Sequence, residues 1–169
     1  MSARLRRVGL IALTHGPGMP AALTGQGAAP ARPPAVLFIC EHGTIKSLLA
    51  KVLFERYASV AGLRMEAVSR GTTADSIVPP WMRTELAGDH FDVTAFRPRP
   101  LRPEDLAGAA LVVSFDVPAS VSAPTHAPRE RWDGLPSVSA DYAAGRDAIE
   151  VRVHHLVDSL MRVQKARQP

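Results

Sequence analysis

The residues with the clearest chemical potential lie in the segment FICEHGTIKS, from Phe38 to Ser47. This segment contains Cys40, the only cysteine in the 169-residue chain. An apolar run leads to the thiol, and a polar loop with one glycine separates it from LLAKVLFERY, which has helical spacing. Backbone N–H groups in such a loop, together with those at a helix N-terminus, attract anions. The segment therefore predicts an oxyanion-binding loop with a thiol at its base.

Cys40 is the candidate nucleophile of this loop, because the N-terminus of a helix favours the thiolate form. Lys46 adds a cation, and the hydroxyl of Ser47 is placed to donate to the sulfur. A thiolate in a phosphate-binding loop can attack phosphorus in line, after which water hydrolyses the phosphocysteine. The alternatives are a buried, unreactive thiol, a solvated lysine and an ordinary helix N-cap at Ser47. The residues predicted to surround the oxyanion are Glu41, His42, Gly43, Thr44, Ile45 and Lys46.

The composition narrows the class of protein. A single cysteine excludes an internal disulfide, a zinc site built from several thiolates and a disulfide relay within the chain. With 46% hydrophobic and 21% charged residues, the chain is typical of one globular domain, and no stretch reaches the ~18 apolar residues of a membrane span. Only 5% of residues are aromatic, and the net charge of +4 comes largely from the chain ends, so no nucleic-acid partner is expected. No metal or other cofactor is expected, since His154, His155 and Asp158 are typical of a solvated helix face.

Residues 1–34 differ in composition from the rest of the chain. A basic start precedes the apolar patch VGLIAL, and Ala29-Pro30-Ala31 has the small residues of a cleavage site, so this segment has the ingredients of an export signal. A flexible tail, or a start codon assigned too early, is the alternative. The protein is therefore expected in the cytoplasm, or in the periplasm or outside the cell if the segment is a signal. The globular domain is expected at residues 35–165.

Strand-like and helix-like segments alternate from Ala35 onward. This alternation predicts an α/β fold with a parallel sheet covered on both faces, and in such sheets ligands bind at the carboxyl ends of the strands. Cys40 stands at the carboxyl end of the first strand. The expected elements are a strand at 35–39, a helix at 48–60, a strand at 64–69, a helix from Pro79 and Pro80 to about residue 87, a strand at 109–115, a short strand within 129–135, and a last helix with Ser139 as its N-cap.

Several motifs resemble one known family. VLFICEHGTIKS is similar to the signature loop of low-molecular-weight protein tyrosine phosphatases and the related arsenate reductases, in which a strand is followed by Cys, five residues, Arg and Ser. SRGT (69–72) resembles the SAGT after their second strand, DLAGAALVVSFD (105–116) their third strand, and the segment from RWDGLPS onward their closing W-x-x-P-D-P motif and last helix. The resemblance covers Ala35 to about Arg162. It implies a three-layer α/β/α fold with a four-stranded parallel sheet, and hydrolase activity of the protein tyrosine phosphatase type.

Two positions depart from the family pattern. Lys46 stands where the family has arginine, so a point charge replaces a planar fork that grips two phosphoryl oxygens. Ser137 stands where the family has its general acid, and serine cannot protonate a leaving phenolate. Asp133 and Asp141 are nearby candidates for that role, or they are surface or capping residues. Glu41 is also unusual beside an anion and is expected to point away or to pair with a cation.

Three functions remain open at this stage. The first is a cysteine-dependent phosphatase acting on phosphate monoesters through a phosphocysteine. The second is an arsenate reductase, which with one cysteine needs an external thiol such as glutathione, mycothiol or a glutaredoxin. The third is a non-catalytic domain that binds phosphate or another oxyanion. The expected partners are therefore phosphate, arsenate or a phosphorylated substrate, and for the reductase an external thiol.

Overall fold

The computed structural model describes residues 33–167, so the export signal considered for residues 1–34 lies almost wholly outside the described residues. Four parallel strands form one sheet in the order β2-β1-β3-β4, which confirms the predicted α/β class and the four-stranded parallel sheet. The elements in chain order are β1 (Ala35–Cys40), α1 (Lys46–Ala61), β2 (Glu66–Gly71), α2 (Pro80–Gly88), α3 (Pro103–Gly108), β3 (Ala109–Ser114), a short 3₁₀ turn (Ala119–Val121), β4 (Arg129–Arg131) and α4 (Tyr142–Ala166).

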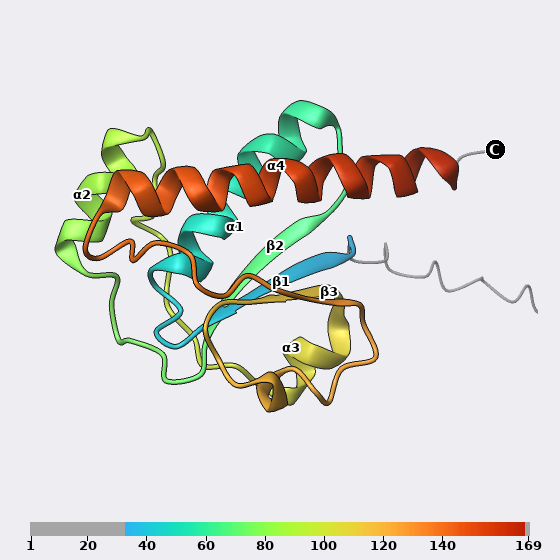
Figure 1. Ribbon diagram of the computed structural model, residues 1–169, viewed down its shortest axis with the longest axis horizontal. Helices are drawn as coiled ribbons and strands as arrows, with labels where there is room; N and C mark the ends of the chain where they lie inside the picture. The colour runs from blue at the N-terminus through green and yellow to red at the C-terminus, as the bar shows by residue number, and fades with distance from the viewer. Residues whose placement is uncertain (1–32, 168–169) are drawn as a thin grey trace, which may run out of the picture. The chain divides into compact units, whose positions relative to one another are not determined.

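The helices cover the two faces of the sheet unequally. The long helix α4 runs across one face with α1 beside it, while α3 lies on the opposite face (Figure 1). Because successive strand residues point to opposite faces, β1 supplies Val36, Phe38 and Cys40 to the larger core and Leu37 and Ile39 to the smaller one. The sheet is thus buried on both sides of β1, and the strand that carries the thiol lies at its centre.

Aromatic packing holds β1 in place. The ring of Phe38 contacts Phe54 on α1 edge-on with centroids 5.9 Å apart, and lies 6.0 Å from Trp132. Phe115 meets Trp132 at 5.5 Å in a second edge-to-face pair. Full burial of a side chain of this size contributes about 1.5–3 kcal/mol, and such aromatic pairs add about 0.5–1.5 kcal/mol. The end of β1 is therefore a rigid base for the loop that follows.

The structure corrects several of the expected boundaries. The second strand is Glu66–Gly71 and the fourth is only Arg129–Arg131. Ser139 does not cap the last helix: Asp141 does, and its carboxylate accepts a hydrogen bond from the Ala144 N–H at 3.0 Å. Ser47 is not an N-cap either, because it lies inside the first turn of α1 with its side chain turned to Cys40. Ser47 contacts Cys40 instead of capping α1, and the nearby Asp141 caps α4 instead of Ser139.

Helix α3 was not expected. It begins directly after the proline-rich connector, with Pro103 in its first turn, and the carboxylate of Asp105 accepts the Arg102 N–H at 2.9 Å. The same carboxylate pairs with Arg70 on β2. Six residues are too short for a clear helical period, which explains why this helix was missed. Among the described residues, no helix is both long and apolar enough to cross a membrane.

Candidate active site

Cys40 lies at the carboxyl end of β1 and is buried, with 6% of its surface exposed. Its sulfur lies 3.0 Å from Ser47 Oγ and accepts a hydrogen bond from the Gly43 N–H at 3.2 Å. Helix α1 begins at Lys46, so its free N–H groups lie immediately after the loop. The predicted strand, loop and helix therefore do bring the thiol, a loop N–H group and a helix N-terminus together.

Two glycines let this loop pack tightly against the end of β2. Gly43 has φ +71°, in the left-handed region, and a Cβ there would lie 2.6 Å from the Gly71 nitrogen. A Cβ on Gly71 would lie 2.8 Å from the carbonyl of His42. The backbones are held in this contact, since Thr72 N–H donates to the Cys40 carbonyl at 3.0 Å. Both positions require glycine because backbone, rather than a flexible side chain, occupies the space.

A chain of buried hydroxyls leads away from the thiol. Ser69 Oγ on β2 lies 2.8 Å from Ser47 Oγ and 3.0 Å from the Gly43 carbonyl. Each hydroxyl has one proton to donate. In one arrangement Ser69 donates to the Gly43 carbonyl, Ser47 donates to Ser69, and the Cys40 thiol donates to Ser47. In the other, Ser69 donates to Ser47, and the Ser47 hydroxyl donates to the sulfur. The chain can therefore accommodate both thiol and thiolate. Ser69 was not a candidate residue, although the SRGT motif was the signal for it.

Lys46 does not point freely into the loop. Its ammonium lies 2.6 Å from Asp116 Oδ2 and donates to the Leu135 carbonyl at 3.2 Å, and only 18% of the side chain is exposed. Asp116 follows β3 and adopts φ +49°, which is rare for a residue with a side chain. Its other oxygen accepts the Gly134 N–H at 2.8 Å. The cation expected to bind an oxyanion thus already has a carboxylate partner, which sequence reasoning did not single out.

The ionisation of Asp116 reflects this pairing. Partial burial acts to raise the pKa of the carboxyl. The hydrogen bond from Lys46, the Gly134 N–H and the charges of Lys46 and Arg131 act in the other direction and outweigh it. The pKa of Asp116 therefore lies below its ordinary value, so this side chain is a carboxylate at neutral pH.

A pocket of about 170 Å³ opens over Cys40. Ser137, in the position where the resemblance places the general acid, forms one wall of it. Asp133 and Asp141 do not line this pocket. Asp133 accepts the Asp116 N–H at 2.8 Å and pairs with Arg131, while Asp141 caps α4. The lining residues are Cys40, Glu41, His42, Ile45, Lys46, Phe115, Asp116, Ser137, Val138 and Ser139.

His42, which lines the pocket, is paired with a carboxylate. His42 Nδ1 lies 3.2 Å from Asp75 Oδ1, and Glu41 Oε2 lies 3.8 Å from His42 Nε2. The other carboxylate oxygen of Asp75 accepts a hydrogen bond from the hydroxyl of the fully buried Thr44. The backbone N–H of Asp75 donates to the His42 carbonyl at 3.0 Å. Asp75 comes from the loop after β2 and had no signal in the sequence. Glu41 is 70% exposed and does not pair with Lys46.

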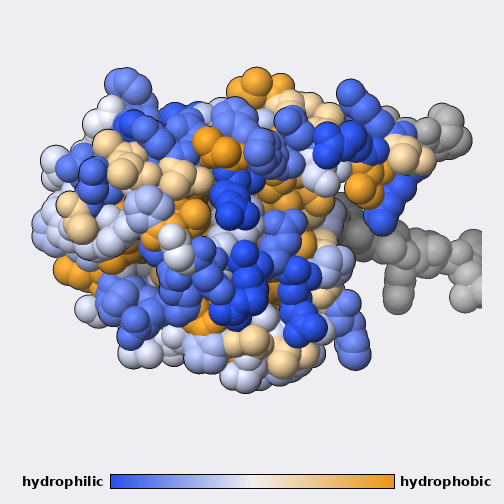
Figure 2. Space-filling view, viewed as in Figure 1, coloured by the Kyte–Doolittle hydropathy of each residue, from blue (hydrophilic) through white to orange (hydrophobic). Residues whose placement is uncertain are grey.

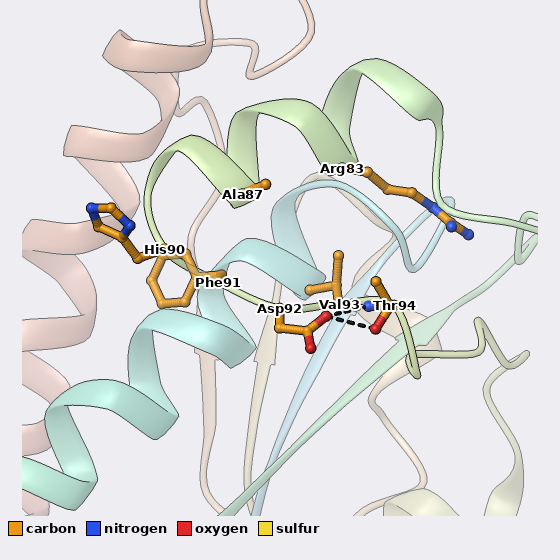
Figure 3. A pocket seen from close by; sticks show the side chains of 7 residues that line it. All are labelled: Arg83, Ala87, His90, Phe91, Asp92, Val93 and Thr94. Atoms are coloured by element: carbon orange, nitrogen blue, oxygen red, sulfur yellow. Dashed lines mark hydrogen bonds between the residues drawn. The ribbon is translucent and has the colours of Figure 1, made fainter.

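A second pocket of about 340 Å³ lies at the end of α2 (Figure 3). Arg83 and Ala87 from α2 line it, followed by the segment from His90 to Thr94. The Asp92 carboxylate accepts hydrogen bonds from the N–H and hydroxyl of Thr94, as the dashed lines in Figure 3 show. None of the loop residues Cys40–Ser47 takes part in this pocket. Hydrophilic residues cover most of the molecular face in Figure 2, with hydrophobic side chains in scattered groups.

Comparison with known proteins agrees with this geometry. A family-wide sequence model described as low molecular weight phosphotyrosine protein phosphatase matches residues 35–151. The match covers more than half of the chain, so the protein belongs to that family. No curated protein matches the chain.

Solved structures share the fold. A thioredoxin-dependent arsenate reductase from Corynebacterium glutamicum is 23% identical with a TM-score of 0.62, and the match covers 80% of this chain but 65% of that one. An arginine phosphatase from Geobacillus stearothermophilus is 19% identical with a TM-score of 0.63 (81% and 99% covered). A low molecular weight protein tyrosine phosphatase from T. tengcongensis is 25% identical with a TM-score of 0.53 (78% and 99% covered). Fold and family together define a cysteine-based protein of the phosphatase and arsenate reductase type.

Proposed function

We propose that this protein is a cysteine-dependent phosphatase that hydrolyses phosphate monoesters through a phosphocysteine, as protein tyrosine phosphatases do. The observation that carries the proposal is the position of Cys40. Its sulfur accepts the Gly43 N–H at 3.2 Å and lies 3.0 Å from Ser47 Oγ, beside the N-terminus of α1 and under an open pocket. A helix N-terminus and nearby hydrogen-bond donors favour the thiolate form of a cysteine, which supports this role.

The proposed reaction has two steps. In the first, Cys40 Sγ attacks phosphorus, a P–S bond forms and the bond to the leaving oxygen breaks. Loop N–H groups from Glu41 to Lys46 stabilise the charge on the phosphoryl oxygens, and Ser47 stabilises the thiolate. In the second step water attacks phosphorus and the P–S bond breaks, which releases phosphate and the thiolate. Lys46 contributes positive charge at one side of the loop while Asp116 holds its ammonium in place.

Turnover of p-nitrophenyl phosphate tests this function. We expect wild-type protein to hydrolyse it and Cys40→Ser to abolish the activity without loss of folding. Phosphotyrosine and phosphoarginine peptides then separate substrate classes, because the solved relatives include a tyrosine phosphatase and an arginine phosphatase. Activity that survives Cys40→Ser would refute the proposed nucleophile.

Arsenate reduction is the second candidate. It is favoured by the pocket wall, where Ser137 rather than a carboxylate occupies the position of the leaving-group acid. Because the chain has one cysteine, the Cys40–arsenic adduct must be resolved by an external thiol, here glutathione, mycothiol or a glutaredoxin. Loss of arsenate that requires one of these thiols and Cys40 would identify this activity.

A non-catalytic oxyanion-binding domain is the third candidate. It is favoured by the ion pair between Lys46 and Asp116, which reduces the free positive charge at the loop. A protein of this kind would show no turnover of either substrate. Phosphate or arsenate would still raise its melting temperature, and Cys40→Ser would leave that shift largely unchanged.

A further inference from the structure

In the pocket over Cys40, Ser137 occupies the position where a carboxylic acid is expected. A phenolate or alkoxide leaving group nevertheless needs a proton. The ionisable side chains that line the pocket, apart from Cys40, are Glu41, His42, Lys46 and Asp116. Any proton donor to the leaving oxygen among the described lining residues must be one of these four.

Three of the four are poor donors. Partial burial acts to raise the pKa of Asp116, but the hydrogen bonds from Lys46 and the Gly134 N–H and the charges of Lys46 and Arg131 together lower it, so Asp116 has no proton to give at neutral pH. Lys46 directs its ammonium to Asp116 and to the Leu135 carbonyl. Glu41 is 70% exposed, so its carboxylate lies largely in solvent.

His42 is held in the geometry of a proton donor. Its Nδ1 lies 3.2 Å from Asp75 Oδ1, within ion-pair distance, so a protonated ring that faces Asp75 through Nδ1 carries its other N–H at Nε2. Asp75 is itself fixed, because its other oxygen accepts from buried Thr44 and its N–H donates to the His42 carbonyl at 3.0 Å. The imidazole lines the pocket and its side chain is 47% exposed, and the nearest carboxylate oxygen to Nε2, Glu41 Oε2, lies 3.8 Å away, beyond hydrogen-bond distance.

From this arrangement we propose that His42 is the general acid of the reaction, with Asp75 as the residue that orients it. The inference rests on the proposed phosphatase function. As Cys40 Sγ bonds to phosphorus and the P–O bond breaks, the leaving oxygen takes the proton from His42 Nε2. In the second step neutral His42 accepts a proton from the attacking water as the P–S bond breaks. Histidine suits both steps because it exchanges a proton near neutral pH.

Leaving-group dependence tests the proposal. 2,4-Dinitrophenolate departs without a proton, whereas phenolate needs one. We expect His42→Gln to lower kcat/KM, which reports only the steps up to departure of the leaving group, about 10²–10³-fold on phenyl phosphate and only a few-fold on 2,4-dinitrophenyl phosphate. Asp75→Asn is expected to lower phenyl phosphate turnover about 10-fold, as for other partners that orient a functional histidine. His155→Gln, the same substitution at an exposed position on α4, is the matched control and should alter neither substrate.

The pH profile gives a second readout. An alkaline fall of wild-type activity on phenyl phosphate is expected for a general acid, and this fall should be absent in His42→Gln. The other titrating or charged groups around His42 are Cys40, Glu41, Lys46, Asp75 and Asp116, so Glu41→Gln is measured alongside. Loop integrity in His42→Gln is checked by the rate of Cys40 alkylation with iodoacetamide, which should match wild type.

The outcomes separate the two proposals. Equal losses of kcat/KM on both substrates, no loss on either, or an alkaline fall that persists in His42→Gln would overturn the role of His42 while leaving the phosphatase intact. Loss of the alkaline fall in Glu41→Gln instead would assign the acid to Glu41 and equally overturn it. If wild-type protein does not hydrolyse 2,4-dinitrophenyl phosphate at all, the proposed function fails, and the role of His42 in it fails too.

Discussion

Replacement of Gly43 by alanine is the sharpest test of how the loop is built. Gly43 has φ +71°, and an added Cβ would lie 2.6 Å from the Gly71 nitrogen and 3.0 Å from two further backbone atoms. Ordinary contact begins at 3.4 Å, so the loop and the end of β2 would have to separate. Gly71 resists this movement, because its N–H donates to the Arg99 carbonyl at 3.1 Å and its carbonyl accepts the Leu101 N–H at 2.8 Å.

The expected cost has two parts. An alanine in the left-handed backbone conformation costs about 1–2 kcal/mol. About 0.4–1 kcal/mol of this is offset, because alanine restricts the unfolded chain more than glycine does. The forced separation adds about 1–3 kcal/mol, as for other overpacked sites. We therefore expect Gly43→Ala to lower the free energy of unfolding by about 3 kcal/mol, a fall in Tm of roughly 9 °C for a chain of this size.

Gly62→Ala is the matched control. Gly62 has φ +72°, nearly the same backbone conformation, but a Cβ there would meet nothing within 4 Å. It should lose only about 1 kcal/mol, or roughly 3 °C in Tm. Thermal and urea unfolding measure both variants, and iodoacetamide alkylation reports whether the Gly43 N–H still holds the sulfur. Equal losses in the two variants would show that the loop yields freely and that the close contact with Gly71 does not constrain it.

Three further changes follow from the site. Lys46→Arg should keep or raise phosphatase activity, because arginine retains the charge and adds a second donor. Complete loss of activity in the steady-state assay would mean that the lysine has another role. The pKa of Asp116 is lowered in the folded protein, so its contribution to stability is present above the ordinary value of 3.8 and is lost as the pH falls below it. Urea unfolding from pH 7 to pH 2.5 should therefore show a smaller acid loss in Asp116→Asn, and parallel curves would contradict the pairing. Gly145→Ala should destabilise the protein although alanine favours helices, because its Cβ would lie 2.7 Å from Val138 Cγ2 and 2.9 Å from Val138 Cα. A rise in Tm would show that the Val138 wall of the pocket gives way.

Local patterns were sufficient for the centre of the fold. The buried run at Ala35–Cys40, the glycine loop and the helical spacing after it predicted a strand, a loop and a helix, and the structure has all three. The contact between Cys40 and Ser47 also follows from the short loop, because the start of α1 must lie close to the end of β1. The start of the last helix was not predictable in this way, because Asp141 caps it instead of Ser139. The helix at Pro103–Gly108 was not predictable either, because the ion pair of Asp105 with Arg70 joins it to a distant strand.

The partners of the site residues come from distant parts of the chain. Asp116 meets Lys46 across 70 positions because β3 lies next to β1 in the sheet. Ser69 and Asp75 reach the loop because β2 lies on the other side of β1. No local pattern encodes which strands become neighbours, so the sequence indicated Cys40, Lys46 and Ser47 but not their partners from β2 and β3.

The sequence by itself determined that Cys40 ends a buried strand in front of a glycine loop and a helix, since apolar runs, glycine and helical period act over a few residues. Only the tertiary structure decided that Lys46 is paired with Asp116, that Asp133 and Asp141 lie outside the pocket and that His42 lies 3.2 Å from Asp75. The physical reason is that hydrogen bonds and ion pairs act over about 3 Å, and the order of strands in the sheet determines which residues come that close.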